Sequence, residues 1–201
     1  MQNSGGGKFI LNDERMDESA FIAKLKTFKG YLVTEYLQPH PEFAKLCEKS
    51  VGCLRFLLGR KLNGDIIDIY SFIRFGTVKS GFVENYAAGG VLAILRDGKY
   101  SEGNILDINN MKNIKIQNHP DTNLPLQGAI PHWSEIKQAA HIIADAMPQM
   151  SYMGIDFCVT HEDRVKVIEI NSLGSLDGFQ MEHSIFESPA GEFFKERLLQ
   201  K

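Results

Sequence analysis

The chain has 201 residues, enough for one large domain or two small ones with a core of ordinary size. Hydrophobic residues make up 43% and charged residues 23%, with a net charge of −3; this argues against the clustered basic surface of a nucleic-acid-binding protein. No apolar run approaches the roughly 20 residues of a membrane span, and no charged-then-apolar leader begins the sequence.

The first predicted elements are a short strand at residues 9–11 and a helix at residues 17–25, which carries acidic residues in its first turn. A strand at residues 31–37 is expected next, stopped by Pro39 and Pro41.

Two apolar runs, residues 52–58 and 65–74, flank Asn63-Gly64, which is the strongest local signal of a β-hairpin. A third strand at residues 91–96 turns at Asp97-Gly98. The polar, Asn-rich stretch of residues 107–128 predicts a long loop, and helices are expected at residues 133–146 and 188–199. Strands in runs with a few helices indicate an α+β fold.

Three cysteines, Cys47, Cys53 and Cys158, are odd in number and lack the spacing of zinc ligands. We therefore expect free thiols in a reducing compartment, which favours the cytoplasm. A lone cysteine is more often a small buried hydrophobe than a catalytic group.

Residues 154–171 are predicted to form a second hairpin, because Val, Ile and Phe fill both halves and the polar residues 161–164 interrupt them. With Glu162-Asp163 as a two-residue loop, His161 pairs with Arg164, and counting outward places Asp156 opposite Glu169. The other face is expected to turn toward the core with Ile155, Phe157, Val159, Ile168 and Ile170.

Asn171 lies two residues beyond Glu169 and therefore points to the same face as Glu169 and Asp156. Two opposed carboxylates repel each other unless a cation lies between them. Carboxylate and amide oxygens are the ligands that hold magnesium together with substrate phosphates, so the hairpin predicts a divalent metal site. The alternative is a pair of solvated carboxylates, each paired with a lysine.

This triplet resembles the magnesium-binding hairpin of ATP-grasp ligases, which join a carboxylate to an amine or similar nucleophile through an acyl phosphate. The resemblance implies ATP and Mg²⁺, or Mn²⁺ in its place, as cofactors. It implies small-molecule partners, a carboxylate and an amine or sugar-linked acceptor.

The segment of residues 31–37 is similar to the family's hinge strand, whose backbone pairs with adenine. The resemblance places Glu35 and Tyr36 at the hinge and Glu42 where a carboxylate holds the ribose hydroxyls. It also implies a partial lid subdomain with the hinge at residues 1–38, and a larger antiparallel-sheet subdomain carrying the metal site at residues 39–201.

Further motifs are similar to one branch, the ATP-grasp domains associated with sugar transfer, which are related to α-L-glutamate ligases. The match runs from Gly5 to about Phe194, and its motifs are residues 50–55, Glu84-Asn85, Gly89-Gly90, residues 119–122 and residues 130–133.

ATP and a carboxylate are both anionic, so we expect Arg55 and Arg74 to offset charge beside the metal as catalytic residues, with Arg55 also holding phosphate. Asn85 is expected to contact the nucleotide. No protein nucleophile is needed.

Several of these residues also have simpler interpretations. Arg55 could pair with a partner carboxylate, such as Asp68 across its hairpin, and Glu35 could be an edge-strand charge. Asn85 with Gly89-Gly90 could only form a turn. Structural hydrogen bonding is favoured over catalysis for two histidines in loops, His119 and His132.

ATP-grasp domains normally begin with a strand bearing a lysine before a Gly-rich lid, whereas this sequence starts at residues 5–7 with the glycines. We expect that lysine to be missing, with a partner chain as one way to complete the lid. The alternatives to a ligase are therefore a non-catalytic remnant that binds a nucleotide or a partner, and a plain metal-binding scaffold.

Overall fold

The computed structural model describes residues 17–30, 34–81, 83–181, 184–188 and 190–199. The chain divides into two compact units, residues 1–37 and residues 38–201. Among the helices within the described ranges, none is both long enough and apolar enough to cross a membrane.

In the first unit, helix α1 (Glu18–Thr27) confirms the predicted helix. It begins at Asp17, whose carboxylate accepts a hydrogen bond from the backbone N–H of Ala20 at 2.8 Å. Residues 34–37 have no regular secondary structure, so the described part of the strand predicted at residues 31–37 is wrong. An extended sequence pattern becomes a strand only beside a neighbouring strand, and the main sheet is built wholly from residues of the second unit. The strand predicted at residues 9–11 lies outside the described residues.

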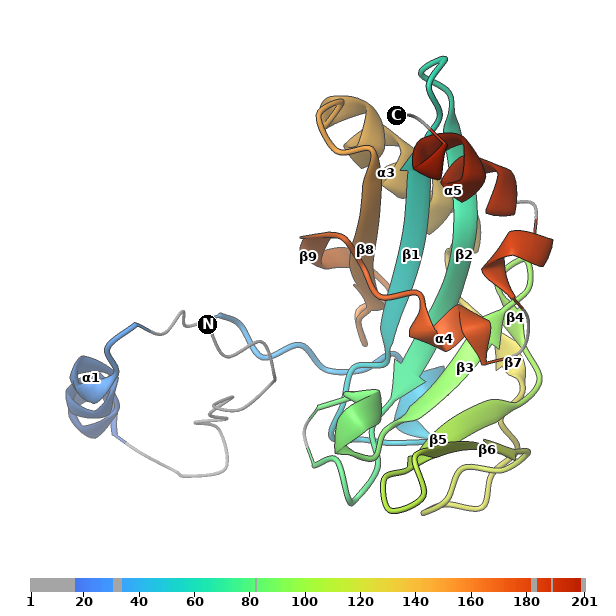
Figure 1. The fold of residues 1–201 in the computed structure, drawn as a ribbon. Helices are drawn as coiled ribbons and strands as arrows, with labels where there is room; N and C mark the ends of the chain where they lie inside the picture. The colour runs from blue at the N-terminus through green and yellow to red at the C-terminus, as the bar shows by residue number, and fades with distance from the viewer. Residues whose placement is uncertain (1–16, 31–33, 82, 182–183, 189, 200–201) are drawn as a thin grey trace. The chain divides into compact units, whose positions relative to one another are not determined.

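The second unit is built on a seven-stranded sheet with the strand order β6-β5-β3-β2-β1-β8-β9 (Figure 1). Every neighbouring pair is antiparallel, and a small separate sheet pairs β4 with β7. The described strands are β1 (Cys53–Arg60), β2 (Ile66–Phe75), β3 (Val91–Leu95), β4 (Lys99–Tyr100), β5 (Gly103–Asp107), β6 (Lys112–Ile116), β7 (Gly128–Ala129), β8 (Tyr152–Val159) and β9 (Val165–Ser172).

Helical segments cover the sheet and join its strands. They are α2 (Pro41–Ala44), η2 (Tyr86–Ala88), α3 (Trp133–Ala146), α4 (Asp177–Gln180), η3 (Ile185–Glu187) and α5 (Gly191–Leu198). Mixed helices with a mostly antiparallel sheet confirm the predicted α+β class.

Both predicted tight turns are confirmed. At the β1–β2 turn, Gly64 has φ 95°, and the Lys61 N–H donates to the Asp65 carbonyl at 2.8 Å. At the end of β3, Asp97 and Gly98 have φ 50° and 73°, which few residues other than Gly, Asn and Asp adopt.

Two predicted boundaries need correction. The stretch of residues 107–128 is not one long loop, because β6 pairs with β5 inside it. Strand β6 lies at the edge of the sheet, where lysine and asparagine side chains are exposed, so it lacks the apolar character of a buried strand. The closing helix α5 begins at Gly191, three residues after the predicted start.

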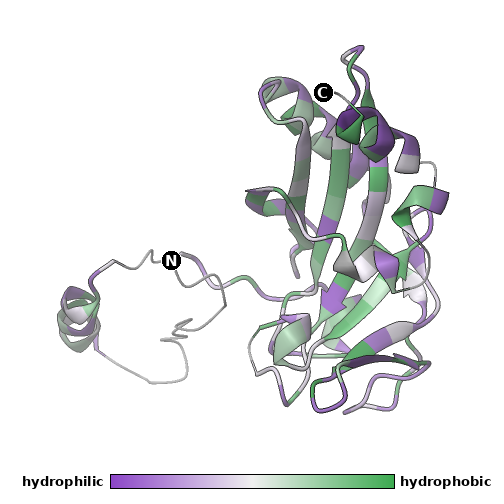
Figure 2. Cartoon of the chain, viewed as in Figure 1, coloured by the Kyte–Doolittle hydropathy of each residue, from purple (hydrophilic) through white to green (hydrophobic). Residues whose placement is uncertain are grey.

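The two faces of the sheet carry different cores. Helix α3 matches its predicted bounds and packs against one face through Ile136, Ala140 and Ala144. The α5 region, with Phe193, lies on the other face, against one end of strands β1 and β2 (Figure 1). Figure 2 shows apolar residues dominating the central strands, with hydrophilic residues interrupting them.

Candidate functional site

The β8–β9 hairpin sets the geometry of the site. Asp156 lies directly opposite Glu169, as the sequence predicted, and Asn171 lies opposite Gly154. Directly paired residues of an antiparallel ladder point to the same face, so the two acids and the amide project together.

The loop that joins these strands differs from the prediction. Val159 pairs with Val165, and the Thr160 N–H donates to the Arg164 carbonyl at 2.9 Å, so the predicted pairing of His161 with Arg164 is wrong. The register then shifts by one residue between Asp156 and Phe157, which leaves Ile168 as an extra residue in a β-bulge. The extra residue in the bulge compensates the one-residue difference in the loop, so Asp156 still lies opposite Glu169. It also leaves Ile168 45% exposed rather than facing the core.

The neighbouring strands bring two arginines to the same face. Arg55 on β1 pairs with Asp156 on β8, and Arg74 on β2 pairs with Cys53 on β1. Strands β2, β1, β8 and β9 are adjacent in the sheet, so four consecutive strands supply the charged groups.

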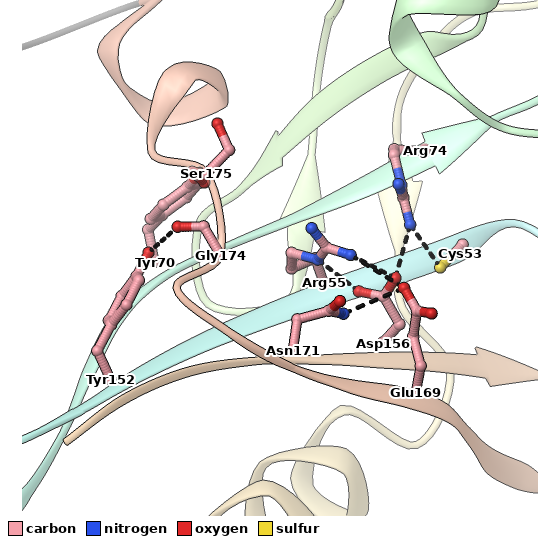
Figure 3. Close-up of polar contacts among 10 residues, drawn as sticks. All are labelled: Cys53, Arg55, Tyr70, Arg74, Tyr152, Asp156, Glu169, Asn171, Gly174 and Ser175. Carbon is pink, nitrogen blue, oxygen red and sulfur yellow. Dashed lines mark hydrogen bonds and ion pairs between the residues drawn. The ribbon is translucent and has the colours of Figure 1, made fainter. Parts of the chain in front are cut away.

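Asp156 is the centre of this cluster and is only 2% exposed. Its Oδ1 accepts from Arg55 Nε at 2.6 Å, and its Oδ2 accepts from Arg55 Nη2 at 2.7 Å and from Arg74 Nη2 at 2.9 Å (Figure 3). The contact with Arg55 is therefore a bidentate pair, which adds geometric specificity to strength. Burial lowers the pKa of Arg55, the bonds to Asp156 raise it, and the net direction is upward, so the guanidinium stays charged.

Glu169 has different surroundings from those of Asp156. Its side chain is 55% exposed, and its Oε1 lies 3.5 Å from Arg55 Nη2. The same oxygen accepts a hydrogen bond from Asn171 Nδ2 at 3.1 Å (Figure 3). Within the described residues, the Oε2 of Glu169 and the Oδ1 of Asn171 accept no further hydrogen bond.

The simpler interpretation of Arg55 is correct in kind, because a carboxylate does pair with it, but that carboxylate is Asp156. Asp68, the partner suggested by the sequence, instead contacts Lys137 and His141 at 2.7 Å each. Among the described residues, neither Asp156 nor Glu169 is paired with a lysine.

The donor chemistry fits a magnesium ion that arrives with substrate phosphates better than a cage made by the protein alone. The described residues hold no cluster of three or more His, Cys, Asp or Glu side chains arranged for a metal. Two acids face two arginines, so the site carries no net charge to attract a bare cation. Yet Glu169 and Asn171 each keep one oxygen that accepts no hydrogen bond from the described residues, and Asp156 retains acceptor capacity beyond its three bonds.

Cys53 lies against Arg74, with its sulfur 2.9 Å from Nη2. Burial raises the pKa of its thiol to about 12, so the group is neutral at ordinary pH. A buried neutral thiol is a poor nucleophile.

The other predicted site residues lie in varied surroundings. Glu35 and Tyr36 are exposed in the irregular segment of the first unit. Glu42 lies in α2, where a hydrogen bond from Lys45 lowers the pKa of its carboxyl. Asn85 precedes the first residue of η2, and its Oδ1 accepts a hydrogen bond from the Ala87 N–H at 3.0 Å. The turn-forming role of Asn85 is therefore observed, and its contact with a nucleotide stays a prediction.

Both histidines singled out in the sequence make hydrogen bonds to the protein. Buried His119 contacts the Gly76 carbonyl through Nε2 at 2.9 Å. His132 contacts Asp163 Oδ1 through Nε2 at 2.8 Å. These contacts join loops, as the structural interpretation expects.

Two tyrosines at the border of the site were not predicted from the sequence. Tyr152 donates its hydroxyl to the Gly174 carbonyl at 2.6 Å, and Tyr70 donates to the Ser175 carbonyl at 3.2 Å (Figure 3). Strand periodicity could have placed Tyr152 here, because it lies four residues before Asp156 and so shares its face.

Comparison with known protein families shows a match over most of the chain. The model described as sugar-transfer associated ATP-grasp matches residues 14–189. No curated protein matches the sequence.

Proposed function

Because the chain belongs to the sugar-transfer associated ATP-grasp family, we propose that it is an ATP- and Mg²⁺-dependent ligase. It would activate a carboxylate as an acyl phosphate for attack by an amine or similar nucleophile, in the synthesis of surface sugar or amino-acid conjugates. One observation carries the proposal: Asp156 and Glu169 face each other, with the Asn171 oxygen and two arginines on the same face.

The arginines would prepare the site for anions. Asp156 engages Nε and Nη2 of Arg55, which leaves the Nη1 group of the same guanidinium for a phosphate or carboxylate oxygen. Arg74, fixed to the same carboxylate, adds a second positive charge. Charges fixed before the ligand binds stabilise a transition state without reorganisation at the moment of reaction.

Glu169 and Asn171, with Asp156, would hold the magnesium. When bound, the ion would supply positive charge that offsets the negative charge on the transferring phosphate. The side chains would orient the phosphates, and the neutral, buried Cys53 thiol would take no part as a nucleophile. The roles of Glu35, Tyr36, Glu42 and Asn85 toward the nucleoside stay predictions.

The test is calorimetric titration of a non-hydrolysable ATP analogue into the folded chain, with magnesium and with EDTA. We expect binding that strengthens with magnesium and little effect of magnesium alone on the melting temperature, because the protein site is neutral. Absence of magnesium-dependent heat at millimolar analogue would contradict nucleotide binding. If magnesium raises the melting temperature equally with and without ATP, the chain is instead a metal-binding scaffold.

A non-catalytic remnant is the second candidate, because guanidinium groups already engage both oxygens of Asp156. Release of phosphate from ATP, measured with a panel of amino acids and amino sugars as acceptors, separates the two. A remnant would bind the analogue but release no phosphate with any acceptor, whereas a ligase should respond to at least one.

A further inference from the structure

The face that carries the site is divided into a charged half and an aromatic half. Leu57 on β1 pairs with Tyr70 on β2 and with Gly154 on β8, so these positions share the face with Asp156. Tyr70 and Leu57 belong to the second hydrophobic core, against which Tyr152 also packs. The border between the halves therefore lies near Gly154, directly opposite Asn171.

The chain crosses this border immediately after β9. Leu173 has φ 59°, which turns the backbone away from the edge of the sheet. Gly174 then approaches the sheet so closely that a Cβ added to it would lie 3.1 Å from Leu57 Cδ2 and 3.7 Å from the Gly154 Cα. Residues 173–176, here called the crossing segment, thus rest on the face beside the charged half (Figure 3).

Two phenol hydroxyls hold the crossing segment. Tyr152 donates to the Gly174 carbonyl at 2.6 Å and Tyr70 donates to the Ser175 carbonyl at 3.2 Å, so consecutive peptide groups are tied to β8 and β2. Burial raises the pKa of the Tyr152 phenol, so it remains a donor across the ordinary pH range.

These bonds matter because β9 is an edge strand. Its last ladder pair is Ser172 with Met153, one residue beyond Asn171. The end of an edge strand opens easily unless something holds it. The bond from Tyr152, next to Met153 in sequence, continues the β8–β9 contact past the last ladder pair.

We propose that Tyr152 and Tyr70 are positioning residues: by fixing the crossing segment they keep the end of β9 closed and hold the Asn171 amide in its place beside Glu169. The effect on Asn171 as a magnesium ligand rests on the proposed function. The effect on the end of β9 does not.

Phenylalanine substitutions isolate the hydroxyls. The Tyr152 ring packs edge-on against Phe194, with centroids 5.7 Å apart, and the Tyr70 ring stacks on Phe72 at 5.6 Å. Tyr152→Phe and Tyr70→Phe keep these ring contacts and remove the hydroxyl donors. Tyr100→Phe is the matched control, because Tyr100 is a buried tyrosine in the other core, beside Phe75.

The first measurement is hydrogen exchange of peptides covering residues 170–181 without nucleotide. We expect each substitution to speed exchange about fivefold, the weight of one typical hydrogen bond, and the double variant more than either. The Tyr100→Phe control should leave these peptides unchanged. Unchanged exchange in Tyr152→Phe would overturn the positioning role.

The second measurement is the affinity for the ATP analogue with magnesium and with EDTA. Tyr152→Phe should weaken the magnesium-dependent affinity about fivefold and leave the affinity in EDTA as it is. Equal weakening under both conditions would mean a general structural effect and would overturn the role of Asn171. A wild-type chain without magnesium-dependent binding would contradict the proposed function, while the exchange measurement would still decide whether the tyrosines close β9.

Discussion

Strands β8 and β9 each place one acid at the same level of the sheet, yet the two carboxylates have opposite surroundings. Asp156 lies on an interior strand, is 2% exposed and has three hydrogen bonds from arginines. Glu169 lies on the edge strand, is 55% exposed and keeps one oxygen uncommitted. We propose a corresponding division of work: the buried acid holds the arginines, and the exposed acid with Asn171 would offer uncommitted oxygens to a metal. The position of each strand in the sheet sets these different surroundings.

Removing the buried acid should give the largest effect. Asp156→Asn leaves two guanidinium groups close together without their shared carboxylate, and breaking a buried ion pair typically costs about 3–5 kcal/mol. Denaturant unfolding should show that loss, and titration should show loss of magnesium-dependent nucleotide binding. A loss of stability below about 1 kcal/mol would mean that Asp156 does not organise the cluster.

The bidentate geometry can be tested on the arginines themselves. Arg55→Lys loses the fork that meets both oxygens of Asp156, and we expect a loss of about 1.5–3 kcal/mol in the free energy of unfolding. Arg74→Lys is the matched comparison, because Arg74 gives Asp156 a single N–H bond that an ammonium group could keep. Equal losses in the two variants would show that fork geometry at Arg55 is not decisive.

Substitution of the exposed acid should separate binding from stability. Glu169→Gln keeps the size of the side chain and removes the charge, so the free energy of unfolding should change by less than about 0.5 kcal/mol. The magnesium-dependent part of the nucleotide affinity should fall by at least about tenfold, the loss typical of even an outer partner of a metal site. Unchanged magnesium dependence in the titration would remove Glu169 from the metal site.

Local chemistry made part of the fold predictable. Asn63-Gly64 and Asp97-Gly98 adopt backbone angles that few other residues tolerate, so the sequence alone located both turns. Strand β6 was missed because exposed lysine and asparagine hide the apolar alternation of an edge strand. A strand was predicted at residues 31–37 because propensity reports what a segment can adopt, while a sheet also requires a neighbour.

The site was predictable only where it depends on one hairpin. The opposition of Asp156 to Glu169 was correct although the loop was wrong, because the bulge at Ile168 compensates a register error of one residue. The pairing of Arg55 with Asp156 joins residues 101 positions apart, and only the order of the strands brings them together. Hydrogen bonds from Tyr152 and Tyr70 to backbone carbonyls depend on the path of the crossing segment, which no residue pattern encodes.

The smallest expected effect is on the pH dependence of stability, and it tests whether water is excluded from the Cys53 thiol at the interior side of the cluster. Burial raises the pKa of Cys53 from 9.0 to about 12, so the unfolded chain loses this proton at a lower pH than the folded chain. The stabilising contribution is therefore fully present below pH 9 and is lost as the pH rises toward 12. Between pH 8 and 9.5, urea unfolding of the wild type should show about 0.8 kcal/mol more loss of stability than Cys53→Ala, in which this group is missing. Between pH 7 and 8 the two proteins should change in parallel. If the free energies of unfolding of the two proteins change in parallel up to pH 9.5, solvent reaches the thiol. The interior side of the cluster would then be less protected from water than the burial of Asp156 indicates.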